Sequence, residues 1–167
     1  MRGIGPSNPN MHGQKLAGAI EKLGFTNAQP LLSSGNVVFE SDIQNIAKLE
    51  AMIQTQWPKQ LGFTSLTIVR SQQQLEALSA KDPYAGLDHG RTSYLLVTFF
   101  KTDPSDTSSF DGKFCPDLSV NALCNVTNPT ESKTVDFMST LDRTFGKDNI
   151  TSRTWLTIQR ILAKMEK

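Results

Sequence analysis

Cysteine and histidine are both scarce in this sequence, with two residues of each in a chain of 167. The cysteines, Cys115 and Cys124, do not form a C-x-x-C pair, and two cysteines are too few for a disulfide framework. Neither they nor His12 and His89 form a cluster with the spacing of zinc ligands. We therefore expect reduced thiols with a structural role and no metal centre.

Long hydrophobic runs are also absent. The longest is Tyr94–Phe100, which Thr98 interrupts, and it falls well short of the roughly 18 apolar residues that a membrane helix requires. The opening residues, MRGIGPSNPN, contain no apolar segment of the kind found in a secretory signal. These features predict a cytoplasmic protein without a membrane segment.

The charge balance shows no excess of either sign. The formal net charge is +1, and contents of 38% hydrophobic and 20% charged residues are ordinary for a folded globular chain. Such a chain produces no long-range field that would attract nucleic acid or an anionic membrane. Neither is an expected partner.

Common catalytic and cofactor-binding motifs are missing as well. The sequence contains no G-x-S-x-G, no phosphate-binding loop ending in Gly-Lys-Ser/Thr and no H-E-x-x-H. Residues 3–13, GIGPSNPNMHG, are rich in glycine and proline, but they lack the G-x-G-x-x-G spacing, and Pro6 and Pro9 remove two amide donors. No bound cofactor is expected.

The hydrophobic pattern of the first 70 residues predicts the order helix, strand, strand, helix, strand. The first helix should end at Gly24, and the turn Gly35-Asn36 should join two strands. Ser41 and Gln44 have the spacing of a capping box for the second helix, which Pro58 should kink or end. The expected strands are 31–34, 37–40 and 65–70, the last with Leu66 and Ile68 on one face.

The second half has a similar order of predicted elements, with weaker sequence signals. Ser71 and Gln74 form another capping-box pattern, and Thr154 is placed to cap the last helix. Ser93–Lys101 reads as a buried central strand, whereas residues 102–117 are rich in turn residues and could hold one short helix. The remaining expected elements are a strand at 118–126 with Cys124 buried, a helix at 134–146 and a strand at 150–153.

This order predicts an α+β fold made of two tandem ferredoxin-like (β-α-β-β-α-β) halves, residues 1–70 and 71–167, with a C-terminal helix. In such a half the first strand is central, between the third and fourth. Only Met1–Ile4 is present to fill that place in the first half. We therefore expect that the natural chain begins upstream with an apolar strand.

Three stretches together resemble a bacterial family, domain of unknown function 1697. They are Arg2-Gly3-Ile4, the segment SSGNVVFESD (33–42) and TSRTWLTIQRI (151–161), which is similar to the T-T-R-x-W-x-T segment of the family. The resemblance implies a compact α+β protein of ferredoxin-like halves, without an established reaction or ligand. Residues 5–9 replace the Asn-x-Gly-Gly of the family, so any role of that asparagine does not carry over.

Ser34-Gly35-Asn36 has two interpretations. A hairpin turn explains the residue types, since glycine accepts a positive φ and asparagine tolerates one. Alternatively, the backbone amides and the Ser34 hydroxyl form a small anion-accepting rim that Arg2 completes.

Arg153 and Trp155 flank the predicted start of the last helix, where an arginine beside helix amides could bind an anion. Equally, Arg153 could pair with a carboxylate and Trp155 could belong to the core.

These residues favour a non-catalytic binding protein for a small or anionic ligand, using Arg2, Ser34, Asn36, Arg153 and Trp155. A second hypothesis is a small-molecule enzyme with Asp88 and His89 as an acid–base pair. A third is an RNA-binding protein, although the aromatic residues Tyr94, Phe99 and Phe100 lie in an apolar run typical of a core.

Overall fold

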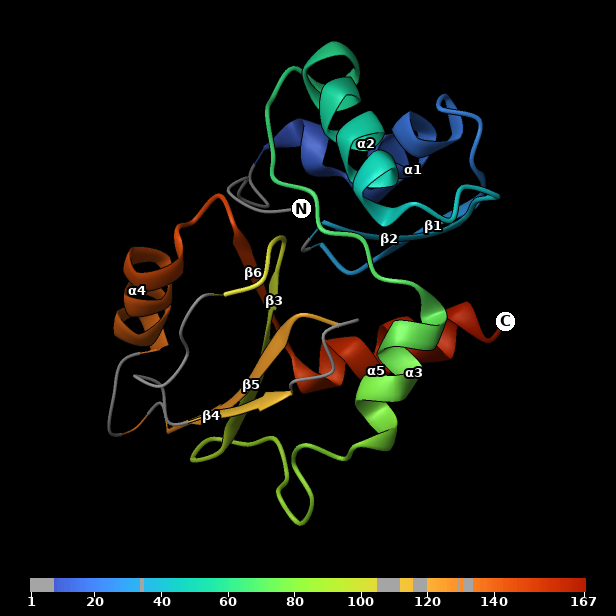
Figure 1. Cartoon of the computed structure of the whole chain (residues 1–167). Coiled ribbons are helices and arrows are strands. Elements are labelled where there is room, and N and C mark those ends of the chain that lie inside the picture. Colours follow the sequence, from blue (N-terminus) through green and yellow to red (C-terminus); the bar gives the residue numbers. More distant parts are fainter. Residues whose placement is uncertain (1–7, 34, 105–111, 116–119, 129, 131–133) are drawn as a thin grey trace. The chain divides into compact units, whose positions relative to one another are not determined.

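The chain forms two compact units, Met1–Val69 and Arg70–Lys167, which we call the first and second unit and describe separately (Figure 1). The computed structural model describes residues 8–33, 35–104, 112–115, 120–128, 130 and 134–167. Met1–Ile4, the expected central strand of the first half, lies outside the described residues.

The first unit packs two helices on one face of a two-stranded antiparallel hairpin (Figure 1). Its elements are η1 (Pro9–Met11), α1 (Gly13–Glu21), β1 (Thr26–Leu31), β2 (Asn36–Glu40) and α2 (Ile46–Leu61). The apolar stripe of α1 is buried, and Gly24 follows the helix with the positive φ of 87° that the sequence predicts. The core of this unit includes Leu16, Ile20, Ile53 and Trp57.

The hairpin differs in register from the predicted one. β1 ends at Leu31 and Asn36 is already the first residue of β2, so four positions separate the two strands instead of the predicted two. Leu32 and Gly35 both have positive φ, 59° and 75°, so the chain needs two left-handed residues rather than one tight Gly-Asn step. The expected strand at residues 31–34 is therefore wrong at 32 and 33, which are turn residues, and Ser34 lies outside the described residues. The antiparallel pairing of the two segments is confirmed.

The second helix begins later than predicted. Asn45 is its N-cap and accepts a hydrogen bond from Lys48 N (2.9 Å), while Ser41 Oγ accepts one from Ile43 N outside the helix. Pro58 lies inside α2 and does not end it. The helix continues to Leu61 and ends at Gly62, which has a φ of 73°.

Residues 65–70 do not form the strand that their alternation predicts. The backbone amides of Thr67 and Val69 donate to side chains of α2, Gln54 Oε1 (3.3 Å) and Glu50 Oε1 (2.9 Å). The buried side of the segment also differs, because Ser65 and Thr67 are buried while Leu66 and Ile68 are only half-buried. Helix side chains thus accept the hydrogen bonds that a neighbouring strand would have accepted.

The second unit is a four-stranded antiparallel sheet between helices. Its elements are α3 (Gln72–Ala80), β3 (Tyr94–Phe100), β4 (Gly112–Cys115), β5 (Ala122–Thr127), α4 (Thr134–Phe145), β6 (Ile150–Thr154) and α5 (Trp155–Met165). The strand order is β4-β5-β3-β6, with the apolar β3 at its centre as predicted. β4 lies in the stretch 102–117 that the sequence assigned to turns or a short helix, so that prediction is wrong for residues 112–115, while 105–111 and 116–117 lie outside the described residues.

Both faces of this sheet are covered (Figure 1). Phe100, Leu123 and Ile150 pack against Leu141 of α4 on one face, and α3 and α5 lie side by side on the other. Cys124 of β5 is buried as predicted, with 2% of its surface exposed. The same strand departs from the predicted inward face at its end, where Val126 is 44% exposed.

The α+β class is confirmed, with five α-helices and two antiparallel sheets in the described residues. The two capping predictions of the second unit are also confirmed: Ser71 and Gln74 form a capping box, and Thr154 caps α5.

Candidate functional site

The junction of β6 and α5 contains two of the residues predicted to bind a ligand, Arg153 and Trp155. In the described residues, β6 is an outer strand of the sheet and pairs only with β3. Thr154 Oγ1 accepts a hydrogen bond from Thr157 N (3.2 Å), which fixes the first turn of α5 directly after the strand.

Arg153 is half-buried on this outer strand. Its Nη1 donates to Thr151 Oγ1 (2.9 Å) and to the Ser152 carbonyl (2.7 Å). These two contacts hold the guanidinium along its own strand, toward Thr151. An arginine held in this way presents its planar array of N–H donors in a fixed orientation.

Trp155 belongs largely to the packing of the second unit. It is 8% exposed, and its ring meets that of Tyr84 edge-on with centroids 5.4 Å apart. Tyr84 in turn donates from its hydroxyl to the carbonyl of Leu96 in β3. The indole therefore anchors the β6–α5 junction to the loop after α3.

The hairpin residues lie in the first unit, apart in sequence from the β6–α5 junction. Asn36 Nδ2 donates to the Leu31 carbonyl (3.4 Å), a contact that joins the start of β2 to the end of β1. Ser34 and Arg2 lie outside the described residues.

The Asp88–His89 pair has a structural explanation. His89 Nδ1 accepts a hydrogen bond from Leu95 N (3.2 Å), and its ring lies against that of Tyr94 with centroids 4.4 Å apart. This bond occupies one of the two ring nitrogens in the neutral tautomer, and Asp88 beside it is exposed. The geometry gives the enzyme hypothesis no oriented acid–base pair.

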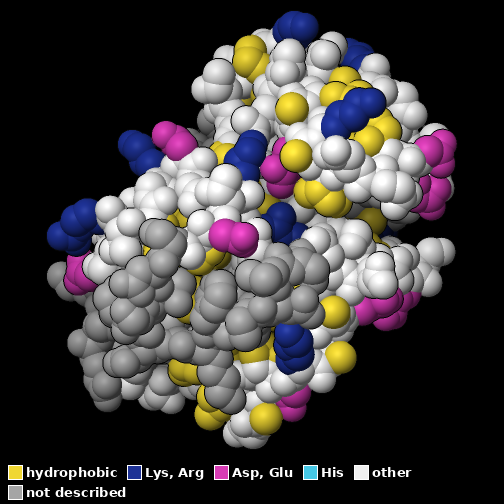
Figure 2. Space-filling model, in the orientation of Figure 1, with side chains coloured by type: hydrophobic (Ala, Val, Ile, Leu, Met, Phe, Trp, Pro, Cys, Tyr) yellow, Lys and Arg dark blue, Asp and Glu magenta, His cyan; other side chains and the backbone are white. Residues whose placement is uncertain are grey.

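Two aromatic residues that an RNA-binding surface would need are part of the core. Phe99 is 4% exposed and Phe100 is fully buried, so neither ring is available for stacking on a base. On the face that Figure 2 shows, basic side chains of the described residues are interspersed with acidic ones, without a large area of one charge.

Arg70 is a second anchored arginine, which the sequence marked only as the end of an expected strand. Its Nε donates to the Val120 carbonyl (2.8 Å) and its Nη2 to the Phe100 carbonyl. Its guanidinium carbon lies 5.5 Å from the centroid of the Phe99 ring. Sequence spacing could not have indicated these contacts, because the partners are 29 or more residues away along the chain.

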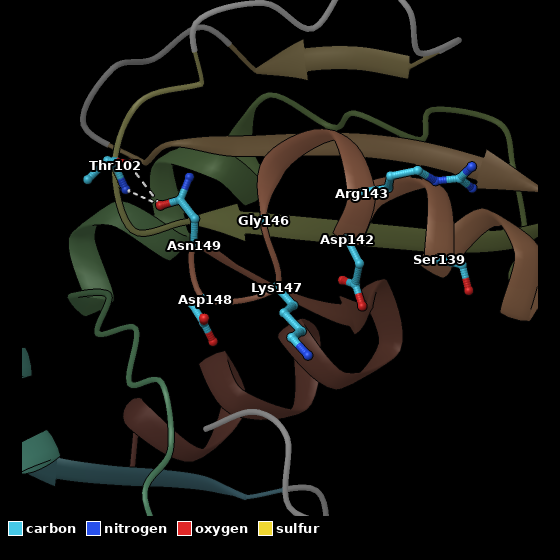
Figure 3. Close-up of a pocket in the computed structure, with 8 residues that line it drawn as sticks. All are labelled: Thr102, Ser139, Asp142, Arg143, Gly146, Lys147, Asp148 and Asn149. Carbon is cyan, nitrogen blue, oxygen red and sulfur yellow. Dashed lines mark hydrogen bonds between the residues drawn. The ribbon is translucent and has the colours of Figure 1, made fainter.

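A shallow hollow lies at the end of α4 (Figure 3). Asn149 Oδ1 accepts hydrogen bonds from Thr102 N (3.0 Å) and Oγ1 (2.8 Å) at its rim. The hollow is open and carries charges of both signs, and it contains none of the predicted site residues. Its lining is Thr102, Ser139, Asp142, Arg143, Gly146, Lys147, Asp148 and Asn149.

These observations define an α+β protein with an anchored arginine on the outer strand of its larger sheet. The chain belongs to a family of proteins of unknown function, DUF1697, whose model matches residues 1–112. The matched region contains the Arg-Gly-Ile opening and the hairpin segment, whereas the C-terminal segment 151–161 lies beyond it.

No curated protein and no solved structure matches the chain significantly. Within the described part of the chain, no helix has the length and apolar character needed to cross a bilayer.

Proposed function

We propose that this protein is a non-catalytic binding protein for a small anionic ligand and that Arg153 binds the charge of that ligand. The supporting observation is the anchoring of Arg153 Nη1 by Thr151 Oγ1 and the Ser152 carbonyl on a half-buried outer strand. A guanidinium that is already oriented loses less conformational entropy when it binds an anion than a mobile surface arginine does.

The other predicted site residues enter the proposal in different ways. Trp155 supports the site through its packing on Tyr84, which positions the strand that carries Arg153. Ligand binding by Arg2, Ser34 and Asn36 in the first unit stays a separate prediction, on which the Arg153 site of the second unit does not depend.

We also propose the ferredoxin-like arrangement for the second half; the first half does not form the strand at residues 65–70 that this arrangement requires. In the second unit, β3 is the first strand in chain order and lies between the third, β5, and the fourth, β6. That placement is the one expected of a ferredoxin-like half and supports the proposal for this unit.

The binding proposal is tested by thermal unfolding in sodium phosphate against sodium chloride of equal ionic strength. Arg153→Gln removes the proposed contact. Arg160→Gln removes the same charge from an exposed arginine of α5. A ligand at about 100 times its dissociation constant adds roughly 2.7 kcal/mol to the free energy of unfolding. We expect a saturable phosphate effect in the wild type and R160Q that is lost in R153Q. A non-saturable effect, or equal loss in both variants, would overturn the proposal.

A further inference from the structure

Two guanidinium groups of the second unit are linked through one face of its sheet. In the β3–β6 register Phe99 lies opposite Thr151, and Val97 lies opposite Arg153. Directly opposed residues of an antiparallel pair project from the same face, as do residues two apart along a strand. Phe99, Thr151 and Arg153 therefore share one face of the sheet.

Contacts on this face form a continuous series. The Arg70 guanidinium lies over the Phe99 ring, with its carbon 5.5 Å from the ring centroid. Thr151 is directly opposite Phe99, and its Oγ1 accepts the hydrogen bond from Arg153 Nη1 (2.9 Å). Arg70 thus contacts one member of the Phe99–Thr151 pair and Arg153 contacts the other.

Both guanidinium groups are anchored, and both arginines are half-buried. Arg70 uses Nε and Nη2 for the carbonyls of Val120 and Phe100, and Arg153 uses Nη1. Two cations held on one partly buried surface raise the local positive potential, and an anion placed between them would be attracted by both.

We propose that Arg70 is the second arginine of the anion site and that the ligand carries a phosphate group or another doubly charged tetrahedral oxyanion. This inference rests on the proposed function of Arg153. One guanidinium already satisfies both oxygens of a monocarboxylate in a bidentate pair. A phosphate group has enough oxygens to accept hydrogen bonds from two guanidinium groups, so two arginines select it over a monocarboxylate.

Nuclear magnetic resonance of the arginine side chains tests the inference on the intact chain. The Nε–Hε signals of Arg70 and Arg153 are assigned from their loss in R70K and R153K, and inorganic phosphate and acetate are then titrated at constant ionic strength. We expect both signals to shift with phosphate along the same saturation curve, and acetate to bind at least about tenfold more weakly, a difference of about 1.4 kcal/mol.

The outcomes separate this inference from the proposal on which it rests. If phosphate shifts the Arg153 signal alone, Arg153 binds the anion and Arg70 only supports the fold, so the inference is wrong. If neither signal shifts, both proposals fail. Equal affinity for acetate and phosphate would exclude the stated ligand class.

R70K provides a second measurement because it keeps the positive charge. We expect its phosphate affinity to fall about tenfold or more, since lysine lacks the forked donors of arginine. Lys101→Gln in the same unit is the control and should bind phosphate like the wild type. Wild-type affinity in a folded R70K would contradict the role of Arg70. If R70K does not fold, the Arg70 Nε–Hε signal of the wild type is assigned instead through its contacts with the Phe99 ring. Its shift with phosphate, or the absence of a shift, then tests the role of Arg70.

Discussion

Gly13 at the start of α1 lies directly against Pro30 of β1. A Cβ atom built on Gly13 would come within 2.6 Å of Pro30 Cβ, closer than two carbon atoms approach without a shift of the chain. The absence of a side chain at position 13 therefore lets the first helix pack closely on the hairpin.

Gly13→Ala should destabilise the protein, whereas Gly18→Ala in the same helix should not. No atom lies within 4 Å of a Cβ built on Gly18, so alanine there gains helix propensity without a clash. We expect a loss of about 1–3 kcal/mol for G13A from overpacking and a gain of up to about 1 kcal/mol for G18A, measured by urea unfolding. Equal stability of the two variants would show that α1 does not approach β1 this closely.

The buried hydrogen bond from Trp57 Nε1 to Thr67 Oγ1, 2.7 Å long, ties α2 to the segment after it. Thr67→Val removes the acceptor and leaves the indole N–H buried, since Trp57 is 2% exposed. The expected loss is about 1–3 kcal/mol of unfolding free energy. Thr67→Ser keeps the hydroxyl and should retain most of the stability; a serine variant as unstable as the valine variant would argue against this bond.

The Thr154 cap offers a similar comparison at the start of α5. Thr154→Ala leaves the Thr157 amide without its side-chain acceptor and should cost about 1 kcal/mol, whereas Thr154→Ser preserves the cap. Chemical denaturation followed by far-ultraviolet circular dichroism measures both. The prediction fails if alanine is tolerated as well as serine.

His89 should protect the amide of Leu95. In His89→Ala that amide loses its acceptor at Nδ1, and Leu95 is only 1% exposed. We expect a destabilisation of about 1–3 kcal/mol and faster hydrogen exchange at the Leu95 amide. His89→Asn offers a side-chain oxygen near the position of Nδ1 and should exchange more slowly than the alanine variant. Unchanged exchange in H89A would rule out the bond.

The second unit was the more predictable part of the fold because local signals there agree with the packing. The apolar run at β3, the Ser71 capping box and the Thr154 cap are all readable from neighbouring residues. The extent of β1 was not predictable, because its sequence is TNAQPL, whose polar residues and proline do not suggest a strand. Its place is set by tertiary contacts such as that of Phe25 with Phe39, whose ring centroids are 5.0 Å apart.

The candidate site could be predicted only in part, because a local signal in the sequence identifies Arg153 but not Arg70. Arg153 was predicted as a site residue from its position beside the N-cap residue of the last helix. Arg70 was not, because its relation to Arg153 depends on the register that places Phe99 opposite Thr151. No spacing within the sequence encodes that register.

The central position of β3 also determines the order in which the second unit can assemble. The hydroxyl pair of Thr98 and Ser152, 2.7 Å apart, joins β3 to a strand 54 positions further along the chain. In the first unit, by contrast, only four positions separate the paired residues Leu31 of β1 and Asn36 of β2. Contacts between distant residues form more slowly than local ones. During synthesis the β1–β2 hairpin can therefore form before β6 is available to pair with β3. Among the described strands, β3 is nearly continuous in apolar residues, and its β6 side stays open until residues 150–154 have been synthesised, so association between nascent chains should begin there.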